Sequence, residues 1–337
     1  MKRLVVKKGK AQHIITSHSP PAVGAPKPRL SICITSHDDN EELQQTVQSA
    51  LATAKGVHEI VVVDDASPVP APVSQHTVHH RSDQRAGVGP SRDFAATMAT
   101  GDYVLLTDSH MRFEPGWYEN IMDRLGEKKT AWCGSCLGLS KQNMDITKFQ
   151  GAYTGARLVL YESNPKDGDV VFEGKWTGPV GDSDDYEISC MMGACYFIHR
   201  DWYHELGGLG MLKMWGSDEP YLSAKIWLGG GELRLARSVR IGHQFRDASP
   251  YTVHKWCIGY NKLRAIKELL GDKAYRKLRD KLPNDVWTRR AVLNLHADES
   301  KVLADRERNS KTFTRTVEWL CDRFNLNNPN ADTDTAN

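Results

Sequence analysis

The chain has 337 residues, which is long enough for one large α/β domain with an appendage or for two domains. Its 40% hydrophobic and 26% charged residues are ordinary for a soluble globular protein, and no apolar run approaches the roughly 18–20 residues that span a bilayer. The seven cysteines are scattered and form no disulfide framework, so we expect reduced cysteines in a cytoplasmic protein.

The net charge of +2 is distributed unevenly along the chain. Residues 1–29 carry +7, residues 30–254 carry −10 and residues 255–316 carry +8. An acidic middle between basic ends suggests a metal-dependent body whose flanks contact a polyanion. The alternative is that the basic helix faces are simply solvated.

The first 28 residues are basic and contain several prolines and glycines, which predicts an extended or disordered lead-in. Folded structure is expected to start with a strand at Arg29–Thr35, which leads into a polar turn. Either Asp39 or Asn40 would cap the helix that follows. A second buried strand, Glu59–Val63, ends at two further carboxylates.

A third strand–helix unit contains a glycine-bearing loop at residues 84–92, a helix at residues 93–100 and an apolar run at residues 103–107. Strands that alternate with helices predict an α/β fold with a parallel, doubly wound sheet and helices on both of its faces. Such sheets bind ligands at the carboxyl ends of their strands. Polar groups follow three of the predicted strands, as expected of a nucleotide-binding edge: His37 to Asn40, Asp64 with Asp65, and Asp108 with His110.

Asp108 and His110 are the first candidate metal ligands. If both continued the strand, their side chains would project to the same face, because alternate residues of a strand share a face. A carboxylate with an imidazole suits a divalent ion of the Mn²⁺ type better than Ca²⁺, which prefers oxygen ligands alone. The alternative is an ordinary turn in which Asp108 caps a backbone group and His110 is exposed.

The middle of the chain has a less regular pattern. Residues 131–139 are predicted as another strand, and residues 151–185 as loops on the acceptor side. Residues 188–199 are apolar and rich in small side chains, which predicts a buried strand that passes close to a ligand. Residues 232–241 are predicted as a strand that places His243 just beyond its end.

From residue 253 onward the pattern is helical and basic, and the last residues are polar. We therefore divide the chain into four parts: a flexible lead-in at 1–28, a nucleotide-binding α/β domain at 29–250, a basic helical extension at 251–324 and a disordered tail at 325–337.

Five motifs occur in an order that resembles a known family. They are Val61-Val-Val-Asp-Asp-Ala-Ser67, Ala99-Thr-Gly-Asp-Tyr-Val-Leu-Leu-Thr-Asp-Ser-His110, Arg200-Asp-Trp-Tyr-His-Glu-Leu-Gly-Gly208, Trp215-Gly-Ser-Asp-Glu219 and Gly242-His-Gln-Phe-Arg246. In these motifs the chain is similar to GT-A-fold glycosyltransferases of family 2, and most of all to the catalytic domain of polypeptide N-acetylgalactosaminyltransferases. The resemblance covers roughly residues 30–247 and implies a GT-A domain followed by a helical extension.

By this resemblance, Asp108, His110 and His243 would bind Mn²⁺ (or Mg²⁺), and the metal would bridge the diphosphate of a UDP-sugar. A surface histidine after a strand is the alternative for His243. The residues expected to contact the nucleotide-sugar are Thr35, His37, Asp65, Arg85, Asp108, Trp215 and Arg246. Arg92 is a further candidate for a nucleotide contact or for an ion pair on the helix surface. Trp215 would stack on the sugar or pack in the core.

Asp218 and Glu219 are the candidate catalytic residues. Inverting members carry an acid pair here, and its second member is the general base. The retaining N-acetylgalactosaminyl relatives carry Glu-Asn at these positions, so the stereochemistry is open. The alternative is that both acids cap the following helix, with Pro220 in its first turn.

The acceptor is inferred from charge alone. Basic segments at both ends suit a polyanion, and DNA with hydroxymethylated pyrimidines, as in some bacteriophages, supplies both the polyanion and the hydroxyl group. A base flipped out of the stack would be received by Trp176, Trp202 or Trp256. Polysaccharide, glycolipid and cytoplasmic protein are the alternative acceptors. A non-catalytic nucleotide- or DNA-binding module and a nucleotidyltransferase are the alternatives from other functional classes.

Overall fold

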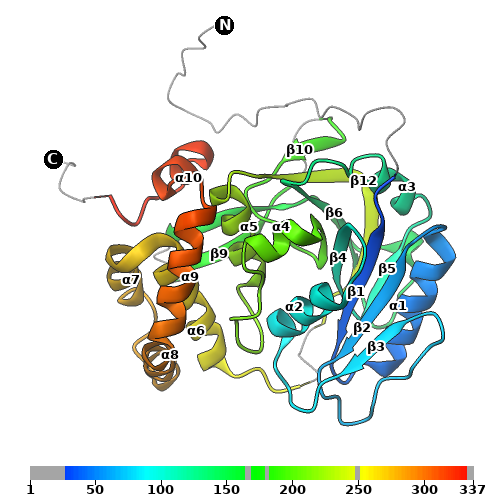
Figure 1. The fold of residues 1–337 in the computed structure, drawn as a ribbon, viewed down its shortest axis with the longest axis horizontal. Helices are drawn as coiled ribbons and strands as arrows, with labels where there is room; N and C mark the ends of the chain where they lie inside the picture. Colours follow the sequence, from blue (N-terminus) through cyan, green and yellow to red (C-terminus); the bar gives the residue numbers. More distant parts are fainter. Residues whose placement is uncertain (1–26, 164–167, 179–181, 247–250, 332–337) are drawn as a thin grey trace, which may run out of the picture.

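The computed structural model describes residues 27–163, 168–178, 182–246 and 251–331. Its centre is a 10-stranded mixed sheet (Figure 1). In spatial order, eight of the strands are β10 (Asp185–Glu187), β12 (Glu232–Gln244), β6 (Thr130–Leu139), β11 (Cys195–His199), β4 (Tyr103–Asp108), β1 (Leu30–Ser36), β2 (Glu59–Asp64) and β3 (Val78–Arg81). Two short strands extend this sheet: β5 (Met111–Phe113) beside β12 and β7 (Ala152–Tyr153) beside β6.

The first half of the sheet is parallel, as the sequence predicts. Strand β1 pairs in parallel with both β2 and β4, and β2 pairs in parallel with β3. The prediction of a parallel sheet is wrong in the other half, where β11 runs antiparallel to both β4 and β6. The short strands β10, β5 and β7 also pair antiparallel with their neighbours. A fully buried strand is apolar whichever way it runs, so its direction is not visible in the residue pattern.

Helices cover both faces of the sheet, as predicted, and the alternation within β1 explains why. Ile32 and Ile34 pack in one apolar cluster with helices α1 (Asn40–Thr53) and α3 (Trp117–Met122). Cys33, which points the other way, packs in a second cluster together with helix α2 (Val88–Met98). That second face is also covered by α4 (Arg200–Glu205) and α5 (Asp218–Leu228).

Two predictions for the middle of the chain need correction. Residues 151–185 are not only loops: beside β7 and the start of β10 they contain β8 (Ala156–Glu162) and β9 (Val170–Trp176), which pair in a separate two-stranded sheet. Strand β12 does not end at Ile241, because residues 240–244 continue to pair with β6 after a register shift. His243 therefore lies within the strand and is held by backbone pairing on both sides.

The C-terminal helices pack on one flank of the sheet, at the left of Figure 1. They are α6 (Lys255–Ala265), a π-helical turn at Ile266–Leu270, α7 (Gly271–Arg279), α8 (Val286–Ala297), α9 (Glu299–Thr312) and α10 (Val317–Phe324). Ile266, Leu269 and Leu320 belong to the same buried cluster as α5, so the extension shares one apolar core with the sheet.

The predicted terminal segments lie partly outside the described residues: the lead-in up to residue 26, and residues 332–337. The expectation of disorder from residue 325 is wrong for residues 325–331, because Leu326 packs against the main apolar core. Asn330 also donates a hydrogen bond to the Leu270 carbonyl at 2.9 Å. Among the described residues, no helix is both long and apolar enough to cross a membrane.

The shared core predicts that the sheet and the extension unfold together. Trp227 of α5 is 1% exposed, and its ring centroid lies 4.8 Å from that of Phe324 in α10. We expect Trp227→Ala to lower the free energy of unfolding by about 3–5 kcal/mol in a single denaturant transition. Leu303→Ala is the control, because Leu303 is 52% exposed and its loss costs less than about 0.5 kcal/mol. Two separate transitions would contradict a shared core.

Candidate active site

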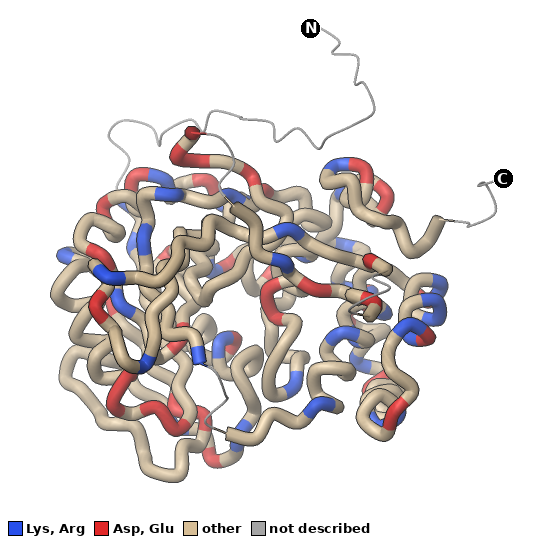
Figure 2. Tube along the Cα trace, turned by 180° about the vertical axis from the view of Figure 1, so that it is seen from behind, with Lys and Arg blue, Asp and Glu red and all other residues tan. Residues whose placement is uncertain are grey.

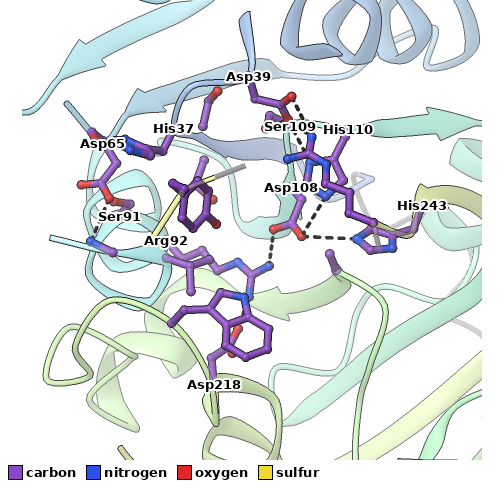
Figure 3. Close-up of a pocket in the computed structure, with 18 of the residues that line it drawn as sticks. His37, Asp39, Asp65, Ser91, Arg92, Asp108, Ser109, His110, Asp218 and His243 are labelled. Atoms are coloured by element: carbon purple, nitrogen blue, oxygen red, sulfur yellow. Dashed lines mark hydrogen bonds and ion pairs between the residues drawn. The ribbon is translucent and has the colours of Figure 1, made fainter. Parts of the chain in front are cut away.

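A cavity of about 530 Å³ lies at the carboxyl ends of β1, β2 and β4 (Figure 3). All eleven residues that the sequence assigned to metal binding, nucleotide-sugar binding or catalysis line this cavity: Thr35, His37, Asp65, Arg85, Asp108, His110, Trp215, Asp218, Glu219, His243 and Arg246. They come from segments far apart in the chain, and the parallel half of the sheet brings the first of them to one edge.

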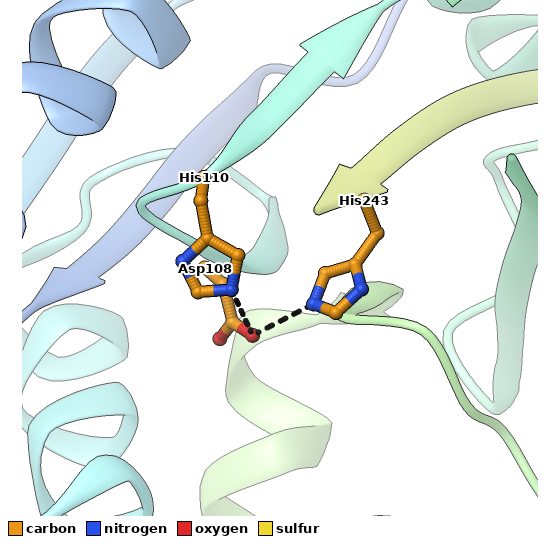
Figure 4. A group of neighbouring side chains, drawn as sticks. All are labelled: Asp108, His110 and His243. Carbon is orange, nitrogen blue, oxygen red and sulfur yellow. Dashed lines mark ion pairs between the residues drawn. The ribbon is translucent and has the colours of Figure 1, made fainter. Parts of the chain in front are cut away.

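Asp108, His110 and His243 converge at one end of the cavity (Figure 4). The potential ligand atoms of these three side chains all lie within 4.8 Å of one another. Asp108 Oδ2 lies 3.5 Å from His243 Nε2 and 3.9 Å from His110 Nε2. His110 follows the end of β4 rather than extending it, so the two residues meet through a turn and not through strand alternation.

Asp39 holds the outer side of this cluster. Its carboxylate lies 2.9 Å from His110 Nδ1 and accepts hydrogen bonds from the Ser109 hydroxyl and the Arg246 guanidinium at 2.7 Å each. The prediction that Asp39 caps α1 is wrong for its side chain, which makes no cap hydrogen bond. A carboxylate behind a histidine fixes the ring orientation and directs Nε2 toward the cluster. The three side chains thus have the donor types of a divalent transition-metal site, and His110 also has a supporting carboxylate.

Arg92 connects this cluster to the acid pair. Its guanidinium is almost fully buried and donates to Asp108 Oδ1 at 2.6 Å and to the carboxylate of Asp218. Burial opposes ionisation of Asp108, but Arg92 and the two nearby imidazoles outweigh it and hold the pKa of Asp108 well below its usual range. Arg92 therefore forms ion pairs, as one alternative predicted, but these pairs are buried at the cavity and not on the helix surface.

Glu219 has a different environment from Asp218. Its Oε1 accepts a hydrogen bond from the Tyr196 hydroxyl at 2.9 Å. Burial and then the negative charge of Asp218 raise the pKa of Glu219 above its usual range, against the opposing effect of Arg92. Both acids lie at the start of α5, but neither is its N-cap, since Ser217 holds that position without a side-chain cap. The capping alternative thus does not account for them.

The opposite end of the cavity carries His37, Asp65 and Arg85. His37 Nδ1 lies 2.7 Å from the Asp65 carbonyl, and the Asp65 carboxylate accepts from the backbone N–H groups of Ala86 and Gly87 at 2.7 and 2.8 Å. Asp65 therefore also holds the glycine-bearing loop in place. The Arg85 guanidinium stacks 4.2 Å from the ring centroid of Tyr251, which lines the cavity and was not predicted.

The loop that carries Trp215 has a strained backbone, which a side chain of α6 stabilises. Met214 and Ser217 have φ values of 54° and 66°, which non-glycine residues rarely adopt. Asn261 of α6 compensates: its side-chain amide donates to the carbonyls of Lys213 and Gly216 at 2.8 and 2.9 Å. Trp215 is 49% exposed at the cavity, so it is not a core residue.

The three tryptophans proposed to receive a base lie in three different environments. Trp176 lines the cavity. Trp202 belongs to α4 and is fully buried, so the prediction for it is wrong. Trp256 stacks with Arg290, whose guanidinium lies 4.8 Å from its ring centroid.

Comparison with known proteins identifies the family. The model of glycosyl transferase family 2 matches residues 31–207, which is more than half of the chain. The chain belongs to this family. Human polypeptide N-acetylgalactosaminyltransferase 10 is 28% identical over 263 residues, which cover 73% of this chain and 42% of that protein. Mouse polypeptide N-acetylgalactosaminyltransferase 5 is 30% identical over 208 residues, or 59% of this chain and 21% of that protein.

The family-2 chain thus spans less than half the length of these relatives. Among solved structures, GalNAc-T7 with UDP, GalNAc and Mn²⁺ superimposes with a TM-score of 0.65 at 18% identity, covering 88% of this chain and 56% of that one. This likeness confirms the predicted GT-A α/β fold.

The buried Arg92 yields a stability prediction. Arg92→Gln leaves Asp108 and Asp218 without their shared cation, so we expect it to cost about 3–5 kcal/mol of unfolding free energy. Lys128→Gln, which breaks an exposed pair with Glu205, is the control and should cost at most about 1 kcal/mol. Adding Asp218→Asn to Arg92→Gln should recover part of the loss in denaturant titrations. Equal losses for Arg92→Gln and the control would refute a bridging role.

Proposed function

We propose that the chain transfers a sugar from a UDP-sugar to a hydroxyl group, with Mn²⁺ or Mg²⁺ held by Asp108, His110 and His243. The convergence of these three side chains beside the large cavity is the observation that carries the proposal. The names of the relatives, which are N-acetylgalactosaminyltransferases, and the UDP and Mn²⁺ of the solved GalNAc-T7 structure support it. A divalent ion in this position supplies Lewis-acid stabilisation of the departing diphosphate.

The chain's own residues would bind and orient the donor. His37, Asp65 and Arg85 at the far end of the cavity suit the uridine, while Thr35 lies between them and the metal end. Arg246, although paired with Asp39 at 2.7 Å, retains further N–H donors for a phosphate oxygen. Trp215 offers an exposed ring face on which the sugar stacks.

Glu219 is the general base of this proposal, and the neighbouring charge of Asp218 raises its pKa. The carboxylate of Asp218 is taken up by Arg92, whereas Glu219 faces the cavity. In the transfer, the acceptor oxygen bonds to the anomeric carbon and the bond from that carbon to UDP breaks. UDP leaves with the electron pair, and the acceptor proton passes to Glu219. A carboxylate with a raised pKa is the stronger base once it is ionised.

For the acceptor, we propose hydroxymethylated pyrimidine bases in DNA, such as phage DNA. Several cations of the helical extension are neutralised by ion pairs, for example Lys267 by Glu299 and Arg306 by Asp272. By contrast, Lys255, Arg289 and Arg290 are exposed and form no ion pair with a described residue. Lys and Arg recur along these helices in Figure 2. A cytoplasmic location belongs to the same proposal, because all seven cysteines are free and buried.

UDP release tests the donor half of the proposal. With a panel of UDP-sugars and Mn²⁺, we expect Asp108→Ala to abolish metal-dependent release. Asp39→Asn should weaken activation by Mn²⁺ about 10–100-fold, since it loosens the ring of His110. Asp123→Asn, far more exposed and paired only loosely with Lys27, is the matched control. No release with any donor would favour a non-catalytic binding module, and release of pyrophosphate would favour nucleotidyl transfer.

Salt dependence tests the acceptor half. The dissociation constant for duplex DNA should rise steeply with salt concentration, and Arg289→Gln with Arg290→Gln should reduce the logarithmic slope by about 2. The paired cations Lys301 and Arg306 provide the control double variant, with a smaller expected change. A salt-independent dissociation constant would exclude DNA and leave a polysaccharide, glycolipid or protein as the acceptor.

A further inference from the structure

A second cavity of about 250 Å³ lies next to the first. The two cavities share Met192, Trp215 and Glu219 among their lining residues. Its other walls come from β9, from the start of α5 and from α6, which contributes Ile258 and Lys262. A group in this second cavity therefore lies next to Glu219, which also lines the first cavity.

Apolar side chains form much of the wall of this second cavity, and its one described cation is already paired with a carboxylate. Phe172, Pro220 and Ile258 line it together with the shared Met192 and Trp215. Lys262 is the only cation among its described lining residues, and its ammonium group is paired with the carboxylate of Glu173. A phosphate group placed inside would meet Glu219 and Glu173 without an unpaired cation. The cavity thus suits a neutral ring with one apolar face.

Outside this cavity, by contrast, the surface carries positive charge without an ion-pair partner among the described residues. Lys255, Ile258 and Lys262 are spaced three and four residues apart, so they lie along one face of α6. Ile258 and Lys262 line the cavity, and Lys255, one turn nearer the N-terminus of the helix, is exposed. Lys255 forms no ion pair with a described residue, and the Arg290 guanidinium stacks on the adjacent Trp256. A group beyond the cavity along this face therefore meets positive charge.

We propose that the second cavity is the acceptor subsite and that it takes a hydroxymethylated pyrimidine base flipped out of DNA. The base is neutral and suits an interior whose one described cation is already paired, while its flanking phosphates stay outside, beside Lys255. Trp215 and Ile258 offer apolar surfaces to the ring, and the Glu173–Lys262 pair presents one acceptor and one donor to the base edge. This inference rests on the proposed glycosyl transfer.

The test uses the full chain, Mn²⁺, the UDP-sugar with the fastest UDP release, and duplex DNA containing hydroxymethylcytosine. Lys262→Met and Glu173→Gln should each raise the KM for the DNA about tenfold, while the KM for the UDP-sugar changes less than twofold. Tenfold corresponds to about 1.4 kcal/mol. Lys267→Met is the control, because Lys267 lies a few residues further along the same helical segment and pairs with Glu299 outside the cavity.

A charge swap separates recognition from structure. The double variant Glu173→Lys with Lys262→Glu re-forms the ion pair between β9 and α6, with donor and acceptor exchanged. Its thermal unfolding midpoint should therefore equal that of the unaltered protein, while the KM for the DNA stays high. If the double variant recovered both the thermal midpoint and the KM for the DNA, the inference would be overturned, because the pair would then be only structural. Transfer to neutral oligosaccharides or to a serine peptide, but not to the DNA, would also overturn it. No UDP release under any condition would instead refute the proposed glycosyl transfer.

Discussion

The site depends on one buried cation. Arg92 lies between Asp108 at the end of β4 and Asp218 at the start of α5, and it contacts both carboxylates. Three negative groups, including Glu219, would otherwise be crowded into a largely dehydrated region, which is costly unless they are paired. Because Arg92 engages only Oδ1 of Asp108, the second oxygen remains directed at His110 and His243. One guanidinium thus sets the geometry of the proposed metal site and of the acid pair together.

The helical extension is part of the site rather than a separate appendage. Asn261 of α6 holds the strained loop that carries Trp215, and α6 also forms a wall of the second cavity. Backbone strain of this kind persists only where surrounding contacts over-determine it, and here the shared apolar core with α5 provides them. The stability of the helices is therefore coupled to the placement of a residue that we assign to sugar binding.

The two cavities differ in the charged groups that line them. The larger one contains the candidate metal ligands together with the guanidinium groups of Arg85 and Arg246, which suits a diphosphate. The smaller one pairs Lys262 with Glu173, and apolar side chains form much of its wall. Glu219 lies where they meet. This division supports a reaction in which a charged donor in the larger cavity and a locally neutral acceptor in the smaller one share Glu219.

The sequence by itself predicted the alternation of strands and helices in the first half of the chain, because buried strands and amphipathic helices have distinct residue periods. Short-range motifs such as Asp108 with His110 and Asp218 with Glu219 were equally visible. Only the tertiary structure decided the direction of β11, the continuation of β12 through His243, the role of Asp39 behind His110 and the bridge from Arg92 to Asp218. These features join residues up to 126 positions apart, and no local periodicity records which distant segments will meet.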